Sequence, residues 1–172
     1  MSSNNNDWRT ELALNAAYRM DESLRMIDIS LQELDDIELW KRPNSSSNSV
    51  GNLMVHLCGN IRQYAISSLG QHPDKRERDS EFSISGGLSK SEVSVMLKET
   101  VSQAKAVISS ATEEELLRYR DVQGFNMSGI GIVMHVVEHL SYHTGQIAYW
   151  VKLLKDQDLG FYDGFDLNIK NE

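Results

Sequence analysis

Apolar side chains recur every three or four positions in four stretches of the chain, and this period predicts four long amphipathic helices. The first stretch covers residues 7–34, and the second runs from Ser49, a predicted N-cap, to about Leu69. Gly70 is expected to end the second helix. Four apolar stripes of this kind are buried most simply against one another. The pattern therefore predicts an all-α fold built as a four-helix bundle.

The second half of the chain repeats this pattern after a charged loop. The segment Ser89–Glu92 has the sequence of a capping box, which predicts the start of a third long helix. A second capping box at Thr112–Glu115 is expected to open a short helical piece. Residues 124–131 are interpreted as a loop, and a fourth long helix is predicted over about residues 128–155. No strand, internal repeat or domain linker is predicted.

Composition narrows the classes of function. The chain has 172 residues, of which 40% are hydrophobic, so residues 1–172 are expected to form a single domain with its own core. The formal net charge of −8 argues against a nucleic-acid partner, because phosphate binding needs a concentrated basic face. The longest apolar runs are far shorter than the ~20 residues of a membrane span, so no membrane partner is expected.

The cysteine content and the N-terminus both favour a cytoplasmic protein. The one cysteine, Cys58, cannot form an intramolecular disulfide, as is typical of a reducing compartment. Its position predicts a small buried hydrophobe and not a ligand. The first residues have neither the basic region nor the apolar region of a secretory signal.

Three histidines at four-residue spacing, His135, His139 and His143, lie in the predicted fourth helix. At about 100° per residue, His143 and His139 lie about 80° and 120° from the centre of the apolar stripe, and His135 lies about 160° away. His139 and His143 are therefore expected beside the core, with His135 mainly toward solvent. His56 lies about 120° from the stripe of the second helix. Because neutral imidazole is the commonest transition-metal ligand, we predict a metal site at His56, His139 and His143 with positions open for water or substrate.

The same residues have plainer interpretations. A polar helix face also produces the spacing HxxxHxxxH, and a single edge histidine such as His56 is more often a hydrogen-bonded surface residue. Glu138 is expected on the surface, and the charged run over residues 74–81 is interpreted as a solvated loop. Gln146 is expected either to support His143 or to be a surface residue. The HExxH motif of zinc proteases is absent from this helix.

Three segments resemble the DinB/YfiT-like superfamily of metal-binding four-helix bundles. They are HVVEHLSYHTGQ at residues 135–146, SVGNLMVHLCGNIRQY at residues 49–64, and RERDSEF at residues 76–82, the last of which resembles a subgroup of unknown function. The resemblance covers most of the chain and implies an up-down-down-up bundle that is often a homodimer. By position it implies His56, His139 and His143 as the ligands, with zinc or nickel as the ion, in agreement with the helix angles.

The resemblance also implies candidate activities. Some members of the superfamily are thiol S-transferases that use a metal and a low-molecular-weight thiol. It therefore implies a metal-dependent transferase that adds a bacillithiol-like thiol to an electrophilic small molecule, since a metal lowers the pKa of a bound thiol. Asn60 and Gln146 are candidates for orienting the substrate. A metal-dependent hydrolase and a non-catalytic metal- or ligand-binding dimer are the alternatives, and family membership does not choose among them.

The C-terminal tail is rich in aromatic residues. Residues 160–168, GFYDGFDLN, contain three of them and carry no helical period. We expect this tail to pack as a flap over the bundle or against a second subunit.

Overall fold

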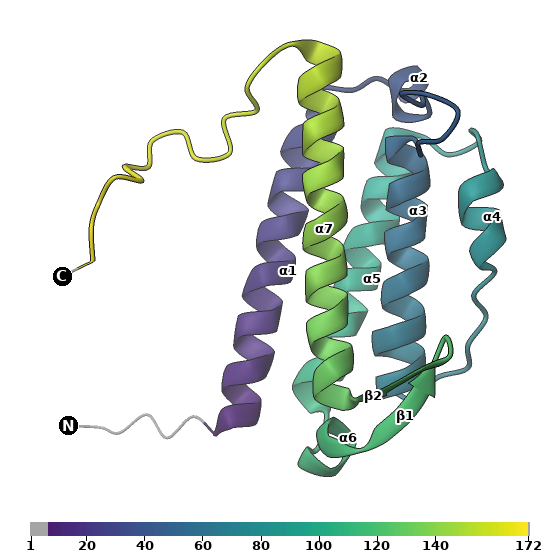
Figure 1. Cartoon of the computed structure of the whole chain (residues 1–172), viewed down its shortest axis with the longest axis vertical. Helices are drawn as coiled ribbons and strands as arrows, with labels where there is room; N and C mark the ends of the chain where they lie inside the picture. Colours follow the sequence, from purple (N-terminus) through teal and green to yellow (C-terminus); the bar gives the residue numbers. More distant parts are fainter. Residues whose placement is uncertain (1–6, 172) are drawn as a thin grey trace.

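Four long helices lie side by side in the computed structural model, which describes residues 7–171 (Figure 1). The chain is mostly helical, as the sequence predicts. Helix α1 contacts α5 and α7, and α3 also contacts α5 and α7, so that the four helices enclose one apolar core. The four are α1 (Trp8–Gln32), α3 (Val50–Ile61) continued by the π-helical segment η1 (Arg62–Leu69), α5 (Lys90–Ser110) and α7 (Gly129–Lys155).

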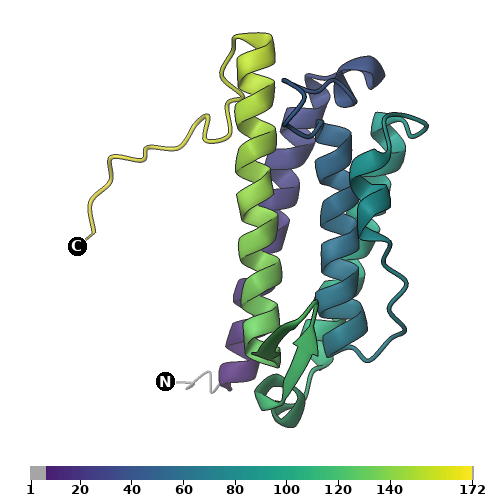
Figure 2. The same ribbon diagram turned by 45° about the vertical axis from the view of Figure 1, so that its right-hand side comes forward.

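Short elements connect the long helices at both ends. They are α2 (Asp36–Leu39), α4 (Arg78–Ser83), α6 (Glu113–Leu117) and the strands β1 (Tyr119–Val122) and β2 (Phe125–Ser128). The hairpin and α6 lie at the opposite end of the long helices from α2 (Figure 1). Helix α4 lies outside α3, along its flank (Figure 2). In Figure 1, α1 and α7 run upward and α3 and α5 run downward.

The hairpin corrects two expectations, namely that the chain has no strand and that residues 124–131 form a loop. Strands β1 and β2 pair antiparallel, and α7 begins immediately after β2. Between the strands, Gln123 and Gly124 have φ values of 54° and 82°. Two successive residues with positive φ are typical of the turn that matches the twist of a two-stranded hairpin. Strands of four residues carry too little alternation to stand out in the sequence.

Side-chain caps fix where the helices begin. The Ser49 hydroxyl accepts a hydrogen bond from the Asn52 backbone, and the Asn52 side chain accepts one from the Ser49 backbone. Ser89 and Thr112 open α5 and α6 in the same way with the glutamates three residues later, as predicted. These bonds satisfy backbone N–H groups that a helix leaves free at its start. The start of α3 in turn determines the direction in which His56 points.

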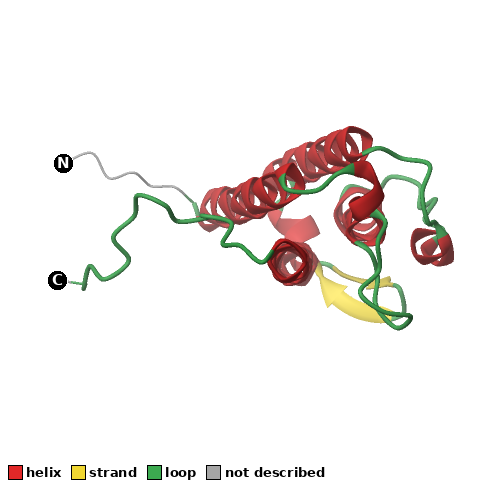
Figure 3. Ribbon diagram, turned by 90° about the horizontal axis from the view of Figure 1, so that it is seen from above, coloured by secondary structure: helices red, strands yellow, loops and turns green. Residues whose placement is uncertain are grey.

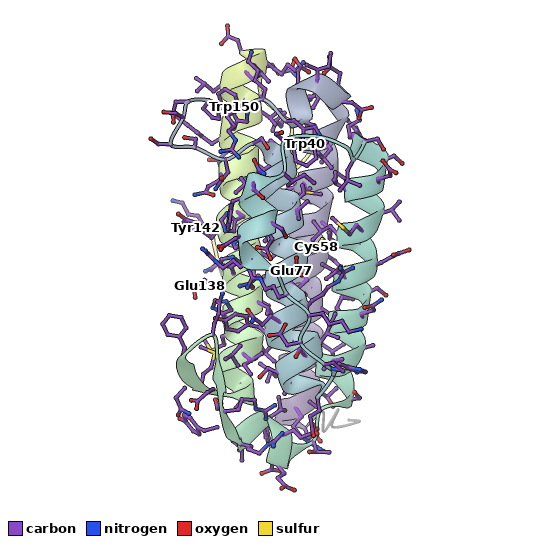
Figure 4. All side chains as sticks on the ribbon, turned by 90° about the vertical axis from the view of Figure 1, so that its right-hand side faces the viewer. Trp40, Cys58, Glu77, Glu138, Tyr142 and Trp150 are labelled. Atoms are coloured by element: carbon purple, nitrogen blue, oxygen red, sulfur yellow. The ribbon has the colours of Figure 1, made fainter. Side chains whose placement is uncertain are left out.

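Although Trp8, expected in the stripe of the first helix, is exposed, each long helix buries most of the apolar stripe that its sequence predicts. Cys58 is 2% exposed and lies among these side chains (Figure 4). Burial raises the pKa of its thiol to about 11, so Cys58 behaves as the small buried hydrophobe that was expected. Within residues 7–171, no helix combines the length and the apolar character that a membrane span requires. The largest fully buried side chains include Met20, Ile27, Leu57, Ile61, Tyr64, Leu97, Ile132 and Leu140.

The aromatic tail only partly follows its prediction. Leu159 is buried, Phe161 packs against the core, and the Phe161 carbonyl accepts a hydrogen bond of 3.0 Å from Arg25 of α1. Tyr162 and Phe165 are exposed, and the chain beyond them leads away from the helices (Figure 3). The tail thus packs on α1, and α7 separates it from α3.

Candidate metal centre

Helices α3 and α7 bring His56, His139 and His143 together. One ring nitrogen of each residue lies within 4.8 Å of the corresponding nitrogens of the other two. The Nε2 atoms of His56 and His139 are 2.9 Å apart, and the ring of His143 is centred 4.5 Å from that of His139. His139 and His143 share a face because they are one helical turn apart, and α3 supplies the third ring. The predicted set therefore converges, although its role as a ligand set stays a prediction.

Hydrogen bonds at Nδ1 leave the lone pair of the ring on Nε2 in two of the three histidines. Nδ1 of His56 lies 2.8 Å from Oε2 of Glu81. A carboxylate only accepts, so Nδ1 donates and Nε2 keeps its lone pair. Nδ1 of His143 lies 2.7 Å from the amide oxygen Oε1 of Gln146, and the same argument applies. Gln146 thus supports His143 by a hydrogen bond, and this is one of the two roles expected for Gln146.

Burial favours the neutral form of two of the three imidazoles, those of His139 and His143. Burial, followed by the charges of His143 and His56, lowers the pKa of His139 to about 3. Burial also lowers the pKa of His143, although its hydrogen bond to Gln146 opposes this shift. Metal binding requires neutral imidazole. Three imidazole nitrogens, held by two packed helices, fit a divalent transition metal in a site that keeps a position open for another ligand.

Glu81 is a residue of this site that the sequence interpretation missed. The run over residues 74–81 was expected to be a solvated loop, yet Glu81 is only 4% exposed. Arg76 donates to both of its carboxylate oxygens, from Nε at 2.7 Å and from Nη2 at 2.9 Å. Burial raises the pKa of Glu81, but the hydrogen bonds from Arg76 and His56 outweigh it and hold the pKa below its usual value. A solvated charged run and a buried ion pair use the same residue types, so composition could not separate them.

Contacts on the flank of α3 hold Glu81 in place. A Cβ at Gly59 would lie 1.9 Å from Oε1 of Glu81, so the carboxylate fits only because position 59 has no side chain. The Asn52 amide donates to the backbone carbonyls of Glu81, at 3.0 Å, and of Ile84, at 2.7 Å. These bonds attach α4 to α3 along the edge that carries the site.

His135 does not point to solvent, and that prediction is wrong. It is half-buried, and its ring stacks on Tyr64 of η1 with centroids 4.0 Å apart. Its Nε2 lies 3.2 Å from the amide nitrogen of Asn60. Burial lowers the pKa of His135. The helix angle gave the direction of His135 only relative to the apolar stripe of its own helix. It could not show that the Tyr64 ring, from the neighbouring segment η1, covers His135.

A shallow pocket of about 460 Å³ opens beside His139. Glu138 is exposed there, as expected, and it projects from α7 together with Tyr142 (Figure 4). Asn60 is 3% exposed, and among the residues of the described structure its Oδ1 finds no hydrogen-bond partner. The pocket gives a small molecule access to one triad histidine and to His135. Its walls are formed by His135, Glu138, His139, Ser141 and Tyr142.

Solved structures with the same fold come from three bacteria. The first is described as the conserved protein of a locus from Enterococcus faecalis; it has a TM-score of 0.71 and 18% identity, over 84% of this chain and 97% of that one. A DinB-like protein from Bacillus cereus ATCC 10987 has a TM-score of 0.65 and 16% identity, over 84% and 91% of the two chains. A DinB-like protein (YjoA) from Bacillus subtilis has a TM-score of 0.65 and 18% identity, over 86% and 96%. At these identities the likeness concerns the fold alone.

The sequence itself matches one family. No curated protein is similar enough to be matched to it. A family model described as "Protein of unknown function (DUF1572)" matches residues 9–162, which is most of the chain. Together with the DinB-like neighbours, this match confirms the DinB/YfiT-like resemblance seen in the sequence. The chain belongs to the DUF1572 family, and its fold is DinB-like.

Proposed function

We propose that the protein binds a divalent transition metal, zinc or nickel, through His56, His139 and His143. We further propose that it transfers a low-molecular-weight, bacillithiol-like thiol to an electrophilic small molecule. The observation that carries the proposal is the convergence of three ring nitrogens within 4.8 Å. The adjoining pocket of about 460 Å³ supports a small-molecule substrate.

The donor set supports an anionic co-substrate. Three neutral imidazoles leave the charge of a divalent ion uncompensated, which favours a thiolate or a hydroxide. When bound, such an ion lowers the pKa of a thiol or of water and so supplies a nucleophile at neutral pH. Cys58 is not the nucleophile in this proposal, because it is buried and its pKa is raised to about 11.

The other residues around the triad would orient its members and the substrate. Gln146 accepts the Nδ1 proton of His143 and so fixes the direction of that ring. The side chain of Asn60 lies next to the His135 ring, and its buried Oδ1 accepts no hydrogen bond from residues 7–171. This orphan oxygen supports Asn60 as the residue that orients a hydrogen-bond donor of the substrate, because an unpaired buried acceptor is unfavourable until a donor reaches it.

Hydrolysis is the second candidate. Glu138 lines the pocket beside His139 and His135, and a carboxylate there is placed to accept a proton from an attacking water. A non-catalytic metal- or ligand-binding dimer is the third candidate.

Consumption of an electrophile that depends on added thiol supports transfer, and turnover without thiol supports hydrolysis. A large fall in melting temperature on chelation, with no turnover of any electrophile or ester, supports the structural role.

Metal content is the first test. We would measure bound metal by mass spectrometry in the tag-free protein, in His143→Ala and in His72→Ala, whose histidine is exposed in the loop after η1. We expect nearly one ion per chain in the parent and in His72→Ala, and loss of the ion in His143→Ala. A parent that holds no metal after incubation with zinc or nickel would overturn the proposal.

Three further properties belong to the same proposal. We propose that the four long helices form an up-down-down-up bundle, which the chain directions in Figure 1 support. We also propose that residues 1–172 are a single domain. A homodimer is supported by the exposed apolar side chains of Tyr18, Met134 and Tyr162 around the groove between α1 and α7, and light scattering would test it. The single buried cysteine supports a cytoplasmic location.

A further inference from the structure

We propose that Glu81, held by Arg76, is the positioning residue of His56, and that this ion pair sets the metal affinity of the centre. The inference rests on the proposed metal site, and it concerns two residues beside the three histidines. Glu81 comes from α4, whereas the three histidines come from α3 and α7. Glu81 and Arg76 then belong to the metal centre, so the connection from which they come does more than join two helices.

Each polar atom of the Glu81 carboxylate has a defined partner. Oε2 accepts from Nδ1 of His56 at 2.8 Å and from Nη2 of Arg76 at 2.9 Å, while Oε1 accepts from Nε of Arg76 at 2.7 Å. With Nδ1 committed as a donor, His56 directs its lone pair at Nε2 toward His139. Carboxylates that hold a ligating histidine in this way fix its tautomer and its ring orientation.

Arg76 has a separate role in this arrangement. Its side chain is 3% exposed, and its Nη1 also donates to Oε1 of Gln63 at 2.8 Å. The guanidinium can only donate, so both carboxylate oxygens act as acceptors, and Oε2 also accepts from Nδ1 of His56. It also cancels the charge of Glu81. The pair therefore orients His56 without reducing the positive charge that the three neutral histidines leave to an ion.

Stability alone does not account for this ion pair. Desolvation offsets most of the attraction in a buried pair, so such a pair contributes little net stability. Gly59 also argues for a role other than stability, because alanine stabilises the interior of a helix such as α3 more than glycine does. A Cβ at that position would overlap Oε1 of Glu81, at 1.9 Å, and would press on Nε of Arg76, at 3.1 Å. The glycine leaves room for the pair, and the pair faces His56.

Cobalt titration of the full chain, followed by visible absorption, tests this inference. We expect Glu81→Ala to bind Co²⁺ about 10- to 100-fold more weakly than the parent, with an altered spectrum at saturation. Glu81→Gln should recover part of the affinity, because its amide oxygen still accepts from His56. Glu77→Ala, an exposed glutamate beside the same helix, is the matched control and should bind as the parent does. Melting of each metal-free variant verifies that it is folded.

Gly59→Ala tests the same contact from the opposite side. In the parent it should weaken cobalt binding as Glu81→Ala does, since the new methyl group displaces the carboxylate. In the Glu81→Ala background it should cause no further loss, because the methyl group then has space. Additive losses, or a Glu81→Ala protein with the affinity and spectrum of the parent, would overturn the inference and leave the metal site standing. A parent that binds no cobalt, zinc or nickel would overturn both.

Discussion

The metal-free protein should lose stability in mild acid more steeply than a variant that cannot titrate at position 139. Folding lowers the pKa of His139 from 6.5 to about 3. Well above pH 6.5 neither state is protonated, so this histidine no longer makes stability depend on pH. As the pH falls toward 3, only the unfolded chain takes up the proton, and the folded state becomes less stable. The loss is about 0.8 kcal/mol at pH 6 and about 2 kcal/mol at pH 5.

Urea unfolding at pH 7 and at pH 5 measures this loss. The protein would be treated with a chelator first, since a bound ion competes with protons for the same nitrogens. His139→Gln removes the titrating group with little change in size, and His72→Gln removes an exposed histidine as a control. Between pH 7 and pH 5 the parent and His72→Gln should each lose about 2 kcal/mol more than His139→Gln. Equal losses in all three proteins would show that His139 is protonated in the folded state, and would refute the buried neutral imidazole.

Three further predictions concern the helix that carries His56. Leu57→Ala, at a position that is 0% exposed, should lower the free energy of unfolding by about 2–5 kcal/mol in urea titration. Gly51→Ala should lower the melting temperature despite the better helix propensity of alanine, because the new Cβ would lie 2.7 Å from the Trp40 ring; an unchanged or higher temperature would contradict this. Ser49→Ala removes the cap of α3 and should reduce the free energy of unfolding by about 1 kcal/mol, as followed by circular dichroism.

Features that depend on one helix at a time could be predicted from the sequence. The apolar stripes located the four long helices, and the serine and threonine caps located several of their starts. The convergence of His139 and His143 followed from their spacing on α7, and the angle of His56 placed it on a matching edge. Periodicity is sufficient for these features because each helix buries one stripe against a common core.

Features that depend on contacts between elements could not be predicted in this way. The burial of Glu81 requires Arg76 from the preceding loop and the absent side chain of Gly59 on α3. The half-buried position of His135 requires the Tyr64 ring from η1. A helix angle describes direction about a single axis, and composition describes a segment without its partners. Neither the helix angle nor the composition shows which residues of a second segment make contact.

The π-helical segment η1 has an evolutionary consequence. A π turn holds more residues than an α turn, so η1 acts as an insertion that the helix absorbs without breaking. His56 precedes it on α3, whereas Tyr64 lies within it and donates to Gln123 of the hairpin at 3.0 Å. Deletion of one residue over 62–69 should therefore return this segment to a regular α-helix, with His56 and the residues after the segment facing as they do now. A change of one residue in length would therefore be tolerated in η1 and not in α3, where it would rotate His56 away from His139 and His143.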